Sequence, residues 1–548
     1  MLGILGELVP EIQSSALLSL LVRQIHQRAW FLVLLSAGLQ ILIFPLPNFY
    51  VLCWIALTPL LIALLRARQP DTLQLTEGIK LLPAKPLQAF LLAYVCGILW
   101  YAGTCYWIYK TMRQYGGVNA SAAVGILILF CLYLALYHGL FGLLISFFAG
   151  GSPFSRRVLL LAPVAWVAVE LARTRITGFP WDLLGTTQVD NIPLARIATV
   201  TGVYGLSFEI MIVSSAWAAA FLVRRDKRMP LLIAALAATV VLQSGRLVSV
   251  PTLPANRIAT LLQANIPILE GTDWTRDYFE TTLHELSTLS LPGQTSHPDL
   301  TVWPESPAPF YTSDPIFRSA LSNLARQANT WVLAGGIGIN NASQSPSQPT
   351  RIYNSAQLVS PTGEWAARYD KVHLVPFGEY VPFKRWFAFA GGLTKEVGDF
   401  SAGTSRMPLE ADGTKLGVFI CYESIFPDEV RQFAAQGAQV LVNISNDGWY
   451  GDSGAYAQHL KQARMRAVEN ARWLLRDTNT GVTASIDPYG RIVASAPRKV
   501  RTALPAPYTL SNATTFYTRH GDWFAYLCAI ICGGALVLRF SIHERAGR

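Results

Sequence analysis

Hydrophobic positions gather in long runs over the first 245 residues of the chain and again near its end. Crossing a bilayer as a helix takes about 20 predominantly apolar residues, and apolar runs of roughly this kind occur at eight places. They lie near residues 29–46, 49–66, 87–108, 122–149, 157–175, 202–223, 229–244 and 523–540. The first and the seventh are short. The pattern predicts a polytopic α-helical membrane bundle of about eight transmembrane helices.

The segment between the seventh and eighth runs follows another pattern, in which short apolar runs alternate with amphipathic stretches. Strands are expected at 258–263, 300–303, 331–336, 356–360, 364–369, 416–420, 482–486 and 491–496, and helices at 274–289 and 319–328. Such alternation favours an α/β layer architecture. We therefore expect an N-terminal membrane domain of seven helices at 1–254, a soluble domain at 255–505, and a linker with the last helix at 506–548.

Composition and charge agree with a membrane protein and indicate its orientation. The chain is 52% hydrophobic and only 14% charged, whereas soluble domains average about 25% charged residues. With a cytoplasmic N-terminus, fifteen Lys and Arg fall in inner loops and five in outer ones, namely Lys110, Arg113, Arg173, Arg175 and Arg196. Positive charge marks the cytoplasmic side, so the soluble domain is expected on the outer face. The net charge of +10 follows from this bias and requires no nucleic acid.

The first 28 residues are expected to stay on the chain. Glu7 and Glu11, rather than basic residues, precede their apolar run, and no small-residue cleavage site follows. A signal peptide instead has basic residues before its apolar run and a small-residue cleavage site after it. We interpret the segment as an uncleaved lead-in to the bundle.

Cysteine usage singles out one thiol. Six of the seven cysteines fall in predicted membrane helices, and Cys421 is the only one in the soluble domain. Exported domains usually pair cysteines as disulfides, and a single one suggests a free reactive thiol. Taken alone, Cys421 fits a small buried hydrophobe better than a nucleophile. Cys528 and Cys532 lack neighbouring histidines, and no phosphate-binding or dinucleotide motif occurs, so neither a metal nor another cofactor is expected.

Three predicted strand ends together supply the groups for acyl transfer. Glu305 follows the strand at 300–303, Lys371 follows the hairpin ending at 369, and Cys421 follows the strand at 416–420. A thiol needs a base to become a nucleophilic thiolate, and Glu305 is suited to that. Lys371 and the backbone N–H of Tyr422 are suited to stabilise the charge on an attacked carbonyl oxygen. Each residue alone is unremarkable in a soluble domain, and the combination is what favours an enzyme.

Several features of the membrane half stay open. Glu170 and Glu209 fall in or near predicted spans, where a charge is costly unless paired, and Glu170 either snorkels or pairs with Arg173. The aromatic loop at 178–188 is expected to face outward, as an interfacial anchor or as part of a lipid entry. The stretch at 379–400 is rich in aromatic residues and is either a lid that dips into the outer leaflet or part of the domain's own core.

Four motifs link the soluble domain to a known family. They are WPES at 303–306, YDKVHLVPFGEYVP at 369–382, CYES at 421–424 and NISNDGWYGDS at 443–453. They resemble the nitrilase superfamily, which has a Glu–Lys–Cys triad and an αββα sandwich. The extended lysine motif, the downstream Asn-Asp-Gly-Trp and the helix layout are specifically similar to the apolipoprotein N-acyltransferases of bacterial inner membranes. This resemblance covers essentially the whole chain.

The resemblance implies a role for particular residues. Glu305 would be the general base, Lys371 its electrostatic partner and Cys421 the acylated nucleophile. Further matches are Glu379, Tyr422 and Glu423 near the site and, more loosely, Trp274. The aromatic stretch contributes Trp386 and Phe387 as candidates for lipid contact.

The implied reaction moves an acyl chain from a phospholipid, through a thioester, to the α-amino group of a diacylglyceryl-cysteine at the N-terminus of an apolipoprotein. It needs no cofactor, and it takes place at the periplasmic face of the inner membrane. Two alternatives remain. One is a membrane-tethered amidase of the nitrilase type, which uses water as acceptor. The other is a non-catalytic scaffold or transporter whose soluble domain only binds.

Overall fold

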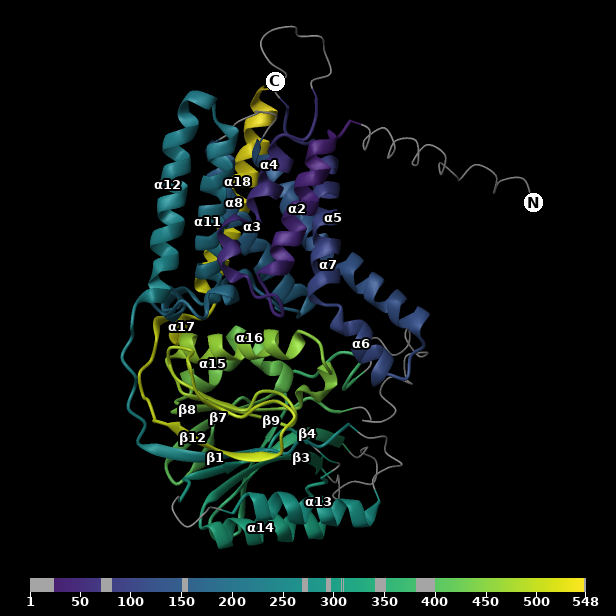
Figure 1. Cartoon of the computed structure of the whole chain (residues 1–548), viewed down its shortest axis with the longest axis vertical. Coiled ribbons are helices and arrows are strands. Elements are labelled where there is room, and N and C mark those ends of the chain that lie inside the picture. The colour runs from purple at the N-terminus through teal and green to yellow at the C-terminus, as the bar shows by residue number, and fades with distance from the viewer. Residues whose placement is uncertain are drawn as a thin grey trace, which may run out of the picture.

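A helical bundle and an α/β domain lie one above the other in a computed structural model of the chain (Figure 1). The structure describes residues 24–69, 81–149, 156–268, 275–291, 297–306, 308, 310–340, 351–380 and 400–546. The α/β domain is inserted in the sequence between the bundle's α12 and its last two helices, α17 and α18. Both ends of the described chain therefore belong to the bundle.

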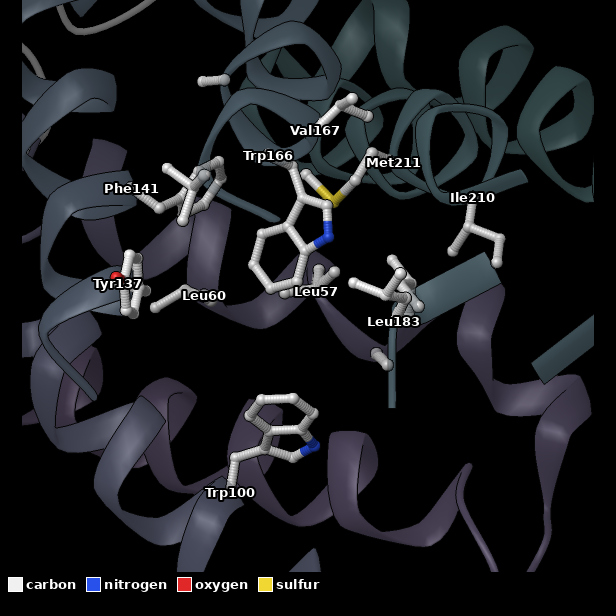
Figure 2. Packing of buried hydrophobic residues seen from close by; sticks show 14 of the residues in the cluster. Leu57, Leu60, Trp100, Tyr137, Phe141, Trp166, Val167, Leu183, Ile210 and Met211 are labelled. Atoms are coloured by element: carbon white, nitrogen blue, oxygen red, sulfur yellow. The ribbon is translucent and has the colours of Figure 1, made fainter. Parts of the chain in front are cut away.

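The bundle is built from helices of very different lengths. These are α2 Gln27–Leu42, α3 Cys53–Ala56, α4 Thr58–Leu65, α5 Pro86–Thr104, α6 Trp107–Gln114, α7 Ala120–Ala149, α8 Arg156–Ala172, α9 Ile192–Ala195, α10 Ala198–Thr201, α11 Val203–Leu222, α12 Arg225–Ser244, α17 Phe516–His520 and α18 Trp523–Ala546. Short 3₁₀ or π turns extend this set at Tyr50–Leu52, Arg173–Thr177, Leu184–Gln188 and Gly245–Leu247. Trp100 of α5, Phe141 of α7, Trp166 of α8 and Met211 of α11 lie in one apolar core (Figure 2).

Within the described residues, four helices are long and apolar enough to cross a membrane: Pro86–Thr104, Ala120–Ala149, Val203–Leu222 and Arg225–Leu247. They match the third, fourth, sixth and seventh of the predicted spans. The other four predicted spans coincide with helices that are shorter or less apolar. In the second, Pro59 begins a new helix after Leu57, as expected for a residue that has no N–H to donate. The total of about eight crossings stays a prediction.

The α/β domain contains two six-stranded mixed sheets. The first has the order β12-β1-β2-β3-β4-β5 and the second the order β11-β10-β9-β8-β7-β6. The strands are β1 Arg257–Gln263, β2 Leu300–Val302, β3 Trp331–Asn340, β4 Arg351–Val359, β5 Trp365–Asp370, β6 Leu409–Ala411, β7 Thr414–Ile420, β8 Val440–Ser445, β9 Leu474–Thr478, β10 Ala484–Ile486, β11 Ile492–Ser495 and β12 Thr502–Tyr508. β1, β2 and β3 are parallel, as are β7, β8 and β9. The expected division at residue 505 falls within β12.

Helices cover the outer face of each sheet, which gives the predicted α/β layers (Figure 1). One apolar core, with Leu261 of β1 and Val418 of β7, lies between the sheets. A second core joins the first sheet to α13 Arg276–Leu289 and α14 Pro315–Ala328. The second sheet is covered by α15 Pro427–Ala435 and α16 Ala455–Asn470. The order of layers is therefore helix, sheet, sheet, helix.

The bundle rests on the α15–α16 layer, and its apolar core continues into the α/β domain. Tyr422, Tyr450 and Met465 belong to the same apolar cluster as the membrane helices. Polar contacts reinforce this junction. The indole N–H of Trp181 donates to Gln458 of α16 at 2.8 Å. Because α16 lies between sheet and bundle, most of its residues are buried.

The structure describes two features of the membrane half that the sequence leaves open. Phe179 and Trp181 in the loop at 178–188 are buried, and Trp181 packs against Tyr450 of the α/β domain. Glu170 does not form an ion pair with Arg173 within 4.0 Å. It accepts instead from the backbone N–H of Leu184 at 2.8 Å, so its partner lies in the loop rather than on its own helix.

Candidate active site

Three strand ends come together at one edge of the two sheets. Glu305 lies three residues beyond β2, Lys371 directly follows β5, and Cys421 directly follows β7. β5 runs in the same direction as β2, because two antiparallel steps separate it from β3. The carboxyl ends of these strands therefore lie on the same side. Lys371 contacts Glu305 directly, both groups act electrostatically on the thiol of Cys421, and all three residues are buried.

Lys371 lies between two carboxylates. Its ammonium donates to Glu305 Oε1 at 3.2 Å and to Glu379 Oε1 at 2.9 Å. The lysine side chain is 1% exposed. Burial disfavours its charged form, but Glu305 and then Glu379 outweigh that effect and hold the pKa of Lys371 well above its usual range. Lys371 is thus a fixed positive charge.

Glu305 is held by three donors. Besides Lys371, the side-chain amide of Asn354 donates to Oε1 at 2.8 Å, and the backbone N–H of Asn446 donates to Oε2 at 2.8 Å. The same Asn354 amide donates to Glu379 at 2.7 Å. Asn354, on β4, therefore joins the same two carboxylates that Lys371 contacts. Sequence reasoning missed it, because an asparagine inside a strand resembles any other polar residue.

Cys421 occupies a strained turn. Its backbone has φ +48°, in the left-handed region that few non-glycine residues adopt, and strain of this kind gathers at functional sites. Burial and then the carboxylate of Glu305 raise the pKa of its thiol well above the usual range, and Lys371 opposes them only in part. The resting group is therefore a thiol that needs a base before it can attack.

A buried polar network packs against the backbone of Cys421. His459 of α16 has Nδ1 3.0 Å from Asp447 Oδ1, and its Nε2 lies 2.7 Å from the hydroxyl of Ser424 and 3.1 Å from the carbonyl oxygen of Cys421. Arg476 of β9 donates to the other carboxylate oxygen of Asp447 at 2.8 Å. Asp447 belongs to the motif at 443–453, whereas His459 and Arg476 had no signal in the sequence.

Charge within this network is fixed by its neighbours. Burial opposes ionisation of Asp447, but Arg476 and His459 outweigh it and hold the pKa of Asp447 well below its usual range. Burial, aided by Arg476, lowers the pKa of His459 against the opposing effect of Asp447. The imidazole is therefore neutral at neutral pH.

Glu423 connects the cysteine turn to the lysine segment. Its Oε1 accepts from the hydroxyl of Tyr369 and the N–H of Val372 at 2.8 Å each, and from the N–H of His373 at 3.1 Å. Its Oε2 accepts from the N–H of Ile420 at 2.7 Å. With these bonds made, Glu423 fixes Lys371 relative to Cys421 rather than facing a substrate.

Tyr422 faces the membrane bundle. Its hydroxyl donates to the carbonyl oxygen of Gly178 at 3.2 Å, and its ring packs edge-on against Phe426. Trp274 lies outside the described residues, and so does the range 381–399 with Trp386 and Phe387. No group of three or more His, Cys, Asp or Glu suited to a metal ion occurs within the described part of the chain.

Comparison with known proteins assigns the family. The model of the carbon-nitrogen hydrolase family matches residues 258–515, and that of the apolipoprotein N-acyltransferase N-terminal domain matches residues 36–216. An amidase from Nesterenkonia sp. is similar in structure, with 20% identity, a TM-score of 0.34, and coverage of 51% of this chain and 98% of the amidase.

Two curated relatives are similar over most of the chain. The apolipoprotein N-acyltransferase of Geobacter metallireducens is 36% identical, over 95% of this chain and 97% of the relative. That of Methylococcus capsulatus is 37% identical, over 82% of this chain and 88% of the relative. The full-length similarity includes the bundle as well as the α/β domain, and the chain therefore belongs to the apolipoprotein N-acyltransferase family.

Proposed function

We propose that this protein N-acylates bacterial apolipoproteins, with a phospholipid as acyl donor and Cys421 as the acyl carrier. The acceptor is the α-amino group of an N-terminal S-diacylglyceryl-cysteine. The observation that supports this most is the buried cluster in which one lysine ammonium contacts both Glu305 and Glu379 beside the strained Cys421. Membership of the family supplies the donor and the acceptor.

The first half-reaction acylates the enzyme. Glu305 takes the thiol proton as the Cys421 sulfur attacks an ester carbonyl carbon of the phospholipid. Lys371, held charged by its carboxylates, stabilises the negative charge that develops on the carbonyl oxygen. The C–O bond to glycerol then breaks, and Glu305 returns the proton to the departing oxygen. The products are a thioester on Cys421 and a lysophospholipid.

The second half-reaction transfers the acyl chain to the lipoprotein. The free amine attacks the thioester carbonyl, and Glu305 accepts a proton from the nitrogen. When the C–S bond breaks, the sulfur recovers a proton and the amide is released. The burial of Cys421 limits the access of water to the thioester. That burial favours an amine acceptor over hydrolysis.

The same proposal includes the placement of the protein. About eight helices would hold it in the inner membrane, with the catalytic domain at the periplasmic face, as the distribution of basic residues indicates. The domains would comprise residues 1–254, 255–505 and 506–548. A cysteine introduced at Glu410, which is exposed on β6, should react with a membrane-impermeant maleimide in spheroplasts. A cysteine in place of Asp226, in the basic first turn of α12, should not react.

An assay with two acceptors separates this function from an amidase that uses water. The purified protein is incubated with phospholipid, with and without a diacylglyceryl lipopeptide that has a free N-terminus. The proposal expects an N-acylated lipopeptide and one lysophospholipid for each amide formed. Release of free fatty acid at the same rate with or without lipopeptide would favour the amidase and contradict the transfer.

A further inference from the structure

A cavity lies beside the active site, between the bundle and the catalytic domain. Its volume is about 700 Å³, within the range of roughly 300–1,000 Å³ typical of ligand pockets. One wall is α6, with Lys110 and Arg113, and the other includes Asp452, Arg498 and Lys499. We call it the α6 pocket. Figure 1 shows α6 at the level where bundle and catalytic domain meet.

The charge of the α6 pocket is strongly positive. Among the described residues, four cationic side chains line it against a single carboxylate, Asp452, which gives these lining residues a formal charge of +3. That carboxylate already contacts Lys499 at 2.6 Å and Arg498 at 3.9 Å, and it is 71% exposed. The cations on α6 are less engaged. Lys110 donates to the carbonyl oxygen of Asp452 at 3.2 Å, and Arg113 has no ion pair within 4.0 Å among the described residues.

These two cations are unusual for their position in the chain. Lys110 and Arg113 belong to the five outer basic residues, on the side of the membrane where positive charge is normally sparse. Besides the bond from Lys110 to Asp452, further contacts hold α6 in place. The hydroxyl of Thr111 donates to the carbonyl oxygen of Trp449 at 3.0 Å, and the rings of Tyr115 and Trp449 pack edge to face. The two cations are therefore available for an anionic ligand.

The pocket shares a wall with the catalytic cluster. The backbone N–H of Asn446 donates to Glu305 at 2.8 Å, and Gly448, two residues further, lines the pocket. In a glycerophospholipid the phosphodiester and the acyl esters hang on the same glycerol. A site that holds the phosphate beyond Gly448 therefore brings an ester towards Glu305 and Cys421.

We infer that the α6 pocket binds the phosphodiester of the phospholipid acyl donor, with Lys110 and Arg113 as its principal contacts. The inference rests on the proposed function, because it assumes that the donor is a phospholipid. Free phosphate has the same charge chemistry, and the acidic side chains of a lipoprotein are the other anions within reach. The experiment below distinguishes these ligands.

The test measures the KM for phospholipid in the acylation of Cys421. Mass spectrometry detects the acylated protein. Lys110→Gln with Arg113→Gln should raise this KM by on the order of 10-fold or more, from roughly 1 kcal/mol for each basic residue at a lipid surface, and leave kcat little changed. Lys110→Arg with Arg113→Lys keeps the charge and should restore the KM. Lys415→Gln, an exposed cation outside the pocket, serves as control.

A second donor identifies what the pocket recognises. Acylation of Cys421 by a p-nitrophenyl acyl ester, which has no phosphate, should be the same in the neutral double variant and the parent. Equal losses with both donors, an unchanged KM for phospholipid, or a raised KM for lipopeptide alone would overturn the inference. If the unmodified protein takes acyl groups from the ester but never from phospholipid, the proposed function fails as well.

Competition covers the case in which the neutral variant does not fold. Glycerol phosphate should inhibit the unmodified protein competitively with phospholipid and not with the p-nitrophenyl ester. Inhibition by inorganic phosphate at equal or lower concentration would mean that the pocket is a site for free phosphate. The absence of competition by glycerol phosphate would contradict the inference.

Discussion

Replacement of Asn354 by Leu tests the part of the site that only the structure reveals. The side-chain amide donates to Glu305 at 2.8 Å and to Glu379 at 2.7 Å, with all three groups buried. Leu has a similarly branched side chain and no donor, so both carboxylates lose a partner. A hydrogen bond to a charged group contributes about 1.5–3 kcal/mol. Because Lys371 still contacts both carboxylates, we expect the free energy of unfolding to fall by about 3 kcal/mol rather than by the full sum of the two bonds.

Asn354→Leu should also slow the formation of the acyl-enzyme. Glu305 keeps Lys371 and the N–H of Asn446 but loses the contact that fixes its orientation, and small displacements of a catalytic group can cost about 10²-fold in rate. Single-turnover formation of the acyl-enzyme measures the rate, and denaturant unfolding measures stability.

Gln357→Leu, on the same strand, is the matched control. The Gln357 side chain is also buried, but its amide nitrogen has no hydrogen-bond partner among the described residues. Its removal should leave the rate unchanged and stability equal or higher, because an unsatisfied buried donor is costly. An Asn354→Leu protein that forms acyl-enzyme at the parent rate would refute the bridging role of Asn354.

Other changes probe neighbouring parts of the site. Glu305→Gln should abolish acyl-enzyme formation in mass spectra while the protein stays folded, since the amide cannot accept the thiol proton; thioester formation at an ordinary rate would disprove its role as base. Tyr422→Phe removes one neutral hydrogen bond to Gly178 and should lower the free energy of unfolding by about 1 kcal/mol; a loss of several kcal/mol would indicate a larger role. Burial lowers the pKa of His459 from 6.5, so its neutral form stabilises the fold above that pH and the contribution is lost as pH falls. Denaturant unfolding between pH 7 and 5 should show this loss in the parent and a weaker one in His459→Gln, and identical pH dependence would contradict it.

The sequence predicts those parts of the fold that local pattern determines. The short apolar run before Cys421 is β7, and the run at 258–263 is β1 with one more residue. β3 was expected to stop at Gly336, since glycines interrupt strands, but it continues to Asn340. A Cβ at Gly335 would lie 2.3 Å from the carbonyl oxygen of Pro304, so glycine there lets the Glu305 segment cross the strand.

Contacts between distant residues were beyond the reach of pattern. Motifs identified Glu305, Lys371 and Cys421, since each follows a strand in a recognisable run. Asn354 and His459 join the same site through side chains that lie 49 and 38 residues from their partners Glu305 and Cys421, and neither has a local signature. The role of the loop at 178–188 stayed open for the same reason, because only the packed domain shows what covers its aromatic residues.

The central claim is that Cys421 carries the acyl chain between two lipids. Intact-protein mass spectrometry after incubation with a phospholipid of defined chain length tests it most directly. The account predicts one added acyl mass on the parent protein, removal of that mass by neutral hydroxylamine or by lipopeptide, and no addition to Cys421→Ala. A Cys421→Ala protein that still N-acylates lipopeptide from phospholipid would contradict the account.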